Sequence, residues 1–204
     1  MLFASLPSSI RAKLAEFERE YRRAESALKV HEIEVLMGLV APALNEFRYA
    51  GSHLSRIFAD DEDTNNLDEI AATQAIDEGI RHLRRATYDA YDAALLFYLR
   101  KCDAFNREYK HTTVTTILPS FPDEQTQIDT IKNELDKEYR DKERRDKYVE
   151  SKEQQYLRAR DISQKWERYR SELNKERAKN LRSTLLSILG ILITLAALLV
   201  ALIK

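Results

Sequence analysis

The C-terminal part of the chain is an uncharged, apolar run that strongly restricts the fold. Residues 183–203 read STLLSILGILITLAALLVALI and contain no Asp, Glu, Lys or Arg. As an α-helix, with a rise of about 1.5 Å per residue, this run is about as long as the hydrocarbon core of a bilayer is thick. A small protein cannot wrap a terminal helix that is apolar on every face. The sequence therefore predicts a single transmembrane anchor over residues 183–204.

Basic residues flank this run unequally, which predicts its orientation. Only Lys204 follows the run, whereas four basic residues precede it: Lys175, Arg177, Lys179 and Arg182. Because positively charged flanks stay on the cytoplasmic side, residues 1–182 are expected in the cytoplasm, where the lone Cys102 remains a thiol. The first residues lack the charged and apolar regions of a secretory signal. We therefore expect a tail-anchored, single-pass membrane protein in contact with membrane lipid.

Small and weakly polar residues form a stripe along the predicted membrane helix. They recur at intervals of four and three: Ser183, Ser187, Gly190, Thr194, Ala197 and Ala201. Helices associate in lipid through close backbone approach at small residues, and a 3.5-residue period keeps the stripe facing its partners. The stripe predicts a homo-oligomeric bundle, which could line a pore because small polar side chains admit water. The alternative is that such residues are simply common in membrane helices.

The rest of the chain predicts an all-α fold, a long-helix bundle whose extended stalk helix continues into the transmembrane helix. The chain has only four Gly and four Pro, and apolar residues recur at helical spacing over 10–28 and 76–98. Pro42 is expected to kink or restart the first helix. Because no Pro follows residue 122 and the only later Gly is Gly190, a third helix is expected to run without interruption from Asp123 into the bilayer.

The chain is expected to divide into three parts. Residues 1–122 form a cytoplasmic helical domain of two long antiparallel helices, the second over about 67–109. Residues 123–182 form a basic helical stalk that packs on this domain at its start, and residues 183–204 form the anchor. Apolar residues are absent from 140–147, so the middle of the stalk is expected to be solvated.

Positive and negative charges are separated along the chain. Overall, 33 Lys and Arg oppose 34 Asp and Glu. Residues 1–136 hold 16 basic and 24 acidic residues, whereas residues 137–182 hold 16 basic and 10 acidic residues. The stalk is therefore suited to lie against anionic lipid or phosphate, and the distal part is not. The alternative is a solvated helix with additional basic residues next to a membrane.

A second basic cluster includes an aromatic residue and lies on one predicted helix. Its members share one helix face: Arg81, Arg84, Arg85 and Tyr88. Arginine and an aromatic ring are suited to a phosphate or a stacked base, so a nucleotide or nucleic-acid ligand is one interpretation. The other is structural, because Asp77 precedes Arg81 and Arg85 precedes Asp89 at the four-residue spacing of helical ion pairs.

The search for catalytic motifs gives one family resemblance. The sequence has no Gly-rich phosphate loop, no zinc-type Cys and His spacing and no nucleophile elbow, so we expect no metal or cofactor. Residues 48–53 read RYAGSH, which resembles the Arg-x4-6-His motif of HEPN ribonucleases. The resemblance implies an all-α ribonuclease, usually dimeric, in which Arg48 and His53 act on the scissile phosphate and the neighbouring 2′-hydroxyl. The alternative is that His53 is a structural or surface residue.

These features favour a non-enzymatic, self-associating membrane protein. Its cytoplasmic helices would sense a ligand or partner protein and transmit that state to the membrane bundle, as expected of an oligomeric effector or pore in bacterial defence or stress. A HEPN-like, membrane-tethered ribonuclease is the alternative. The layout also resembles that of SNARE proteins, which implies a tether or fusion role. The layers that would be apolar in a SNARE bundle contain basic residues here: Lys142, Arg145, Lys152 and Arg170.

Overall fold

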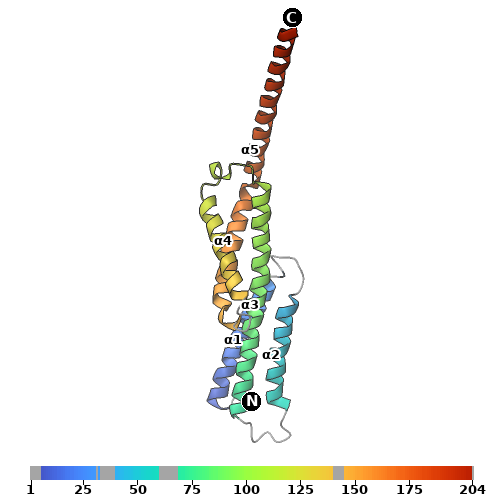
Figure 1. The fold of residues 1–204 in the computed structure, drawn as a ribbon. Coiled ribbons are helices and arrows are strands. Elements are labelled where there is room, and N and C mark those ends of the chain that lie inside the picture. Colours follow the sequence, from blue (N-terminus) through green and yellow to red (C-terminus); the bar gives the residue numbers. More distant parts are fainter. Residues whose placement is uncertain (1–5, 31, 33–39, 60–68, 140–144, 204) are drawn as a thin grey trace.

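The chain folds as a long helical bundle with one helix projecting from its end (Figure 1). The computed structural model describes residues 6–30, 32, 40–59, 69–139 and 145–203. Within these residues there are five α-helices and no strand, which confirms the predicted all-α fold. The helices are α1 (Ser8–Val30), α2 (Ala41–Ala59), α3 (Glu69–Glu108), α4 (Phe121–Glu138) and α5 (Val149–Ile203). A short 3-10 helix, η3 (Val114–Thr116), lies between α3 and α4.

Helix α3 is the shared spine, and its first half packs against α1 and α2. Lys13 of α1 pairs with Asp77 at 2.7 Å, and Glu20, seven residues later, pairs with Arg84 at 3.3 Å. The two pairs advance together, so α1 runs parallel to α3. Helix α2 runs in the opposite direction, as Figure 1 shows. The three helices enclose a small core made of Ile10, Phe17, Ala50, Ala72, Ile76, Ile80 and Leu83.

The second half of α3 packs against α4 and α5. Tyr91 donates a hydrogen bond to Glu153 at 3.2 Å, and Tyr109 donates one to Asn174 at 2.8 Å, so α5 runs parallel to α3. Helix α4 lies antiparallel to both (Figure 1). The second core includes six buried aromatic residues: Tyr91, Tyr98, Phe105, Tyr109, Tyr156 and Trp166. The bundle therefore consists of two three-helix bundles, stacked end to end, that share α3.

This arrangement differs from the two antiparallel helices expected in residues 1–122. That part of the chain contains α1, α2 and α3, and α1 and α3 are parallel because α2 lies between them in the sequence. Pro42 does restart the helix as predicted, since it lies in the first turn of α2, where its missing N–H has no helical partner to bond. The second long helix, expected over about 67–109, is α3.

The uninterrupted third helix was a wrong prediction. Residues 139–148 separate α4 from α5, and the two helices are antiparallel. Residues 140–147 between them include no apolar side chain, whereas reversal of the chain places the apolar face of α4 against the bundle: Ile128, Ile131 and Leu135. Helix α5 stays packed as far as Leu173, which is fully buried. Only residues 174–182 therefore separate the bundle from the uncharged run.

Candidate functional site

The end of α5 is an apolar helix that none of the other described residues covers. It is the one helix among the described residues that is long and apolar enough to cross a membrane, and its apolar window has a mean hydropathy of 1.3 with no share buried. Large side chains there are exposed, for example Leu185 at 64% and Leu189 at 53%. A core helix of a soluble protein would be mostly covered. The exposed surface fits the predicted membrane anchor.

The stripe residues lie on this exposed helix. Ser187 donates its hydroxyl proton to the carbonyl of Ser183 at 3.0 Å, and Thr194 donates to the carbonyl of Gly190 at 2.8 Å. The hydroxyl groups are therefore satisfied within the helix, so they carry a lower cost in lipid. A Cβ atom added at Gly190 would meet nothing within 4 Å, which leaves room for another helix. The side chains of Ala197 and Ala201 lie outside the described residues.

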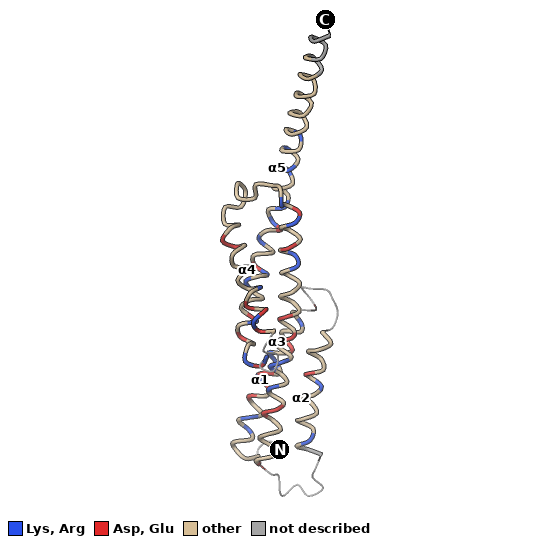
Figure 2. The backbone as a smooth tube through the Cα atoms, in the orientation of Figure 1, with Lys and Arg blue, Asp and Glu red and all other residues tan. Residues whose placement is uncertain are grey.

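The predicted juxtamembrane basic residues lie on α5 between the bundle and the uncharged run. All four are exposed: Lys175, Arg177, Lys179 and Arg182. We call them the basic collar. Figure 2 shows basic residues on α5 directly beyond the bundle and none along the described apolar part that follows. The collar is placed to contact headgroups when the apolar part is inserted.

A buried group of charged residues joins the two three-helix bundles. Lys152 of α5 is fully buried, and its ammonium lies 2.7 Å from Glu138 of α4 and 3.2 Å from Asp92 of α3. Neither contact has hydrogen-bond geometry at the ammonium, which also lies 4.8 Å from the ring centre of Tyr88. Glu138 accepts a further hydrogen bond from Gln155 at 3.1 Å. These contacts connect α3, α4 and α5 through one buried cation.

The same group extends to α2. Arg145 pairs with Asp89 at 2.7 Å and with Glu46 at 3.5 Å, and Glu46 lies 2.6 Å from His82 Nδ1. Burial raises the pKa of Asp89 to about 6, although Arg145 acts in the opposite direction. We call these charged residues the charged junction: Glu46, His82, Asp89, Asp92, Glu138, Arg145 and Lys152.

The residues of the charged junction are paired with one another across four helices. Its carboxylates are engaged by Lys152, Arg145 and His82. In the described parts of the chain, no group of three or more His, Cys, Asp or Glu residues could hold a metal ion. Removing one member of a buried ion pair strongly destabilises a protein, because the other charge stays buried and uncompensated. Binding of a ligand or another protein that separates these groups would therefore weaken the contact between the two bundles.

Sequence reasoning missed this junction, although one signal was present. Lys152 occupies the helical seam between Val149 and Tyr156, where an apolar residue would be expected, and all three are buried. A charged residue in an apolar seam indicates a buried partner. Its partners Asp92 and Glu138 lie 60 and 14 positions away in the sequence, and no spacing rule connects them.

The predicted phosphate cluster on α3 is divided among structural contacts. Arg81 pairs with Glu78, Arg84 pairs with Glu20 of α1, and the buried Tyr88 donates a hydrogen bond to Glu138. The sequence predicts that Asp77 pairs with Arg81 and that Asp89 pairs with Arg85. In the structure, Asp77 pairs with Lys13 of α1 and Asp89 pairs with Arg145. Arg85 is half-buried. The four residues do not converge on one open site.

Arg48 and His53 both lie on α2 but contact different neighbours. The guanidinium of Arg48 lies 5.3 Å from the ring centre of Tyr49 and is exposed. His53 is half-buried and stacks on His82, with ring centres 5.1 Å apart. Burial and the neighbouring His82 lower the pKa of His53. Five residues of regular helix turn the direction of a side chain by roughly 140°, so the two residues do not share a face of α2.

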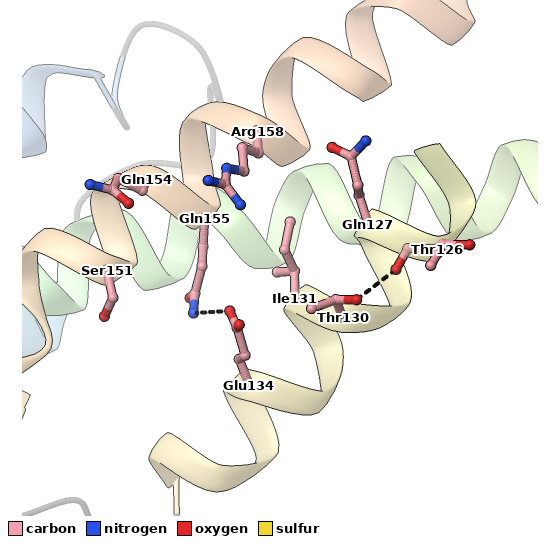
Figure 3. Close-up of a pocket in the computed structure, with 9 residues that line it drawn as sticks. All are labelled: Thr126, Gln127, Thr130, Ile131, Glu134, Ser151, Gln154, Gln155 and Arg158. Atoms are coloured by element: carbon pink, nitrogen blue, oxygen red, sulfur yellow. Dashed lines mark hydrogen bonds between the residues drawn. The ribbon is translucent and has the colours of Figure 1, made fainter. Parts of the chain in front are cut away.

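A groove between α4 and α5 is a concave feature of the described residues (Figure 3). Its volume is about 280 Å³, and Figure 3 shows Ile131 between polar side chains of the two helices. Gln155 of α5 crosses the groove by donating a hydrogen bond to Glu134 of α4 at 3.1 Å. Arg158 lies next to Gln155 on the α5 side of the groove (Figure 3). The groove is close to the lower size limit for ligand pockets, and its polar groups do not surround a common point.

Known proteins give no further identification of these features, because no protein-family model, no curated protein and no solved structure matches the chain.

Proposed function

We propose that the protein is a non-enzymatic, single-pass membrane protein that self-associates through the C-terminal part of α5. The observation that carries this proposal is the uncovered apolar helix with small residues along one side. Such a helix is unstable in water and becomes stable when its surface is covered by lipid and by copies of itself. The basic collar supports an orientation in which the helical bundle is cytoplasmic.

Close packing, not polar attraction, drives this association. The hydroxyl protons of Ser187 and Thr194 are used within their own helix, so they are not available to a partner. Gly190 lies between them on the same stripe and lets two backbones approach. A bundle built this way assembles in the bilayer, and its small polar inner surface is suited to a water-filled pore.

The cytoplasmic helices provide the regulated part. Helix α5 is continuous from the charged junction to the membrane, and the junction connects it to α3 and α4. We propose that a ligand or partner protein bound to the bundle changes these contacts and alters the position of α5, as in an oligomeric effector of bacterial defence or stress. A rigid helix transmits such a displacement over its length.

Substitution of the stripe tests the proposal. Gly190→Leu places a bulky side chain at the point of closest approach and is expected to reduce the oligomer to a monomer in mild detergent. Thr184→Leu is the matched control, because Thr184 also bonds within its helix but points roughly 100° away from Ser183. An unchanged oligomer in Gly190→Leu, with unchanged permeability of liposomes, would refute association through this stripe.

The ribonuclease alternative rests on the resemblance of residues 48–53. Arg48 and His53 would have to meet across two chains to act on one phosphate, because they lie on different sides of α2. The test is RNA cleavage by the purified full chain and by His53→Ala. Cleavage that disappears in His53→Ala would replace the proposal of a non-enzymatic protein.

A further inference from the structure

The end of the helical bundle lies close to the predicted membrane surface. Leu173 is the last fully buried residue of α5, and Arg182 directly precedes the uncharged run. The nine helical residues between Leu173 and Ser183 span about 14 Å. The headgroup layer on each side of a bilayer is about 5–8 Å thick, so the bundle ends within about 10 Å of the headgroups. This gap is about one Debye length at physiological salt.

The connection between α3 and α4 occupies this end of the bundle. We call residues 109–120 the α3–α4 turn. Tyr109 donates a hydrogen bond to Asn174, and Glu108 pairs with Arg170 at 2.8 Å, so the turn is level with the last packed part of α5. Figure 1 shows it beside α5 at the point where α5 leaves the bundle. Any membrane that contains the apolar part of α5 therefore faces this turn.

The α3–α4 turn has the chemistry of a surface that binds phosphate headgroups. Lys110 and His111 are exposed, and so are the hydroxyl-bearing side chains of Thr113, Thr115 and Thr116. The turn contains no Asp or Glu. Together, residues 109–120 and 174–182 hold five basic residues and one acidic residue. The cations attract anionic lipid, and the threonine hydroxyls can donate hydrogen bonds to phosphate oxygens.

Two acidic residues near this end, Glu108 and Glu124, are paired within the bundle, whereas Asp123 and Glu172 are exposed. Glu108 pairs with Arg170, and Glu124 lies 2.5 Å from Lys165 and accepts a hydrogen bond from Trp166 at 2.7 Å. These carboxylates therefore repel headgroups less than free ones would. The exposed Lys and Arg residues of 109–120 and 174–182 are Lys110 and the basic collar.

The turn is also held in one conformation. Val114 and Leu118 are buried, and Leu118 N–H donates to the carbonyl of Val114 at 2.9 Å. Thr112 N–H donates to the carbonyl of Tyr109 at 2.9 Å. Because the backbone is already ordered, contact with a membrane requires little further loss of conformational entropy.

We propose that the α3–α4 turn docks on the anionic headgroups of the membrane in which α5 is inserted, with Lys110 as its central contact. This inference rests on the proposed membrane insertion and goes beyond it, because the anchor alone leaves the bundle free to tilt. Docking gives the bundle two attachments to the bilayer, the collar on α5 and the turn. The bundle is then held upright, and displacement of α5 acts directly on its membrane-inserted part.

Hydrogen exchange of the full chain in nanodiscs tests this docking. Exchange of backbone amides in residues 109–120 is compared in pure phosphatidylcholine and in phosphatidylcholine with about one third phosphatidylserine. We expect exchange to slow about fivefold in the anionic lipid, which corresponds to the attraction of one lysine to an anionic surface. Lys110→Glu should abolish the slowing, and high salt should do the same.

Lys137→Glu is the matched control. Lys137 is also exposed, but its neighbour Glu138 is level with Lys152, about 30 Å from Leu173 along α5. The proposal is overturned if exchange is the same in the two lipids, or if Lys110→Glu and Lys137→Glu have equal effects. Extraction with alkaline carbonate separates this failure from a failure of the anchor. A chain that stays in the membrane without docking retains the proposed anchor, whereas a chain that is released refutes both.

Discussion

Replacement of the buried lysine is the most informative test of the charged junction. Lys152→Met retains most of the side-chain volume and removes the charge, which leaves Glu138 and Asp92 without the cation between them. Loss of one partner of a buried ion pair costs about 3–5 kcal/mol, because an uncompensated charge stays in a low-dielectric interior. For a domain of this size, that loss lowers the melting temperature by roughly 6–20 °C.

The assay is thermal unfolding of the full chain in detergent, followed by circular dichroism. Lys137→Met is the control, since Lys137 is exposed and its loss is expected to change the unfolding free energy by less than about 0.5 kcal/mol. The double variant Lys152→Met with Glu138→Gln should recover part of the loss, because it removes one of the two uncompensated carboxylates. A Lys152→Met protein that melts like the wild type would refute the reasoning.

Four further predictions concern single residues of the bundle. Burial raises the pKa of Asp89 to about 6, so the folded state holds its proton more tightly than the unfolded chain, and this contribution to stability is lost as pH rises from about 4 through 6. Urea unfolding over this range should show a smaller fall with pH in Asp89→Asn than in the wild type; equal slopes would contradict the assignment. Gly79→Ala should lower the unfolding free energy by about 1–2 kcal/mol, because its Cβ would lie 2.7 Å from the Phe17 ring. Gly51→Ala should raise the same free energy by about 0.5–1 kcal/mol, because its Cβ meets nothing within 4 Å. Urea titrations in which Gly79→Ala stabilises the protein or Gly51→Ala destabilises it would refute this. The Cys102 thiol is buried and its pKa is raised to about 12, so a maleimide should label it only after unfolding, and rapid labelling of the native protein would contradict that burial.

The long apolar helix and the all-α fold could be predicted because their signals are local. An uncharged run of sufficient length is complete within residues 183–203, and helical spacing of apolar residues is visible over a few turns. The restart at Pro42 was predictable for the same reason, since proline lacks the N–H that a helix interior requires.

The break between α4 and α5 has no helix-breaking residue to mark it in the sequence. Neither Gly nor Pro occurs there. The loss of apolar residues over 140–147 indicates a change of chain direction as readily as a solvated helix. Reversal is favoured because α4 buries Ile128, Ile131 and Leu135 against the rest of the bundle, which an isolated stalk could not do.

The partners of the charged junction could not be predicted from one sequence. Arg145 pairs with Asp89 and Glu46, which lie 56 and 99 positions earlier in the chain. Helical spacing connects residues three or four positions apart, so it favoured the local pair of Arg85 with Asp89. Only the stacking of two three-helix bundles on a shared α3 brings the distant charges together.

The oligomeric mass of the full chain in mild detergent, compared with that of residues 1–182, tests the central proposal most directly. The proposal predicts that the full chain assembles and that residues 1–182 are monomeric, because the apolar part of α5 provides the association. A monomeric full chain, or the same oligomer from both proteins, would contradict self-association through the membrane helix.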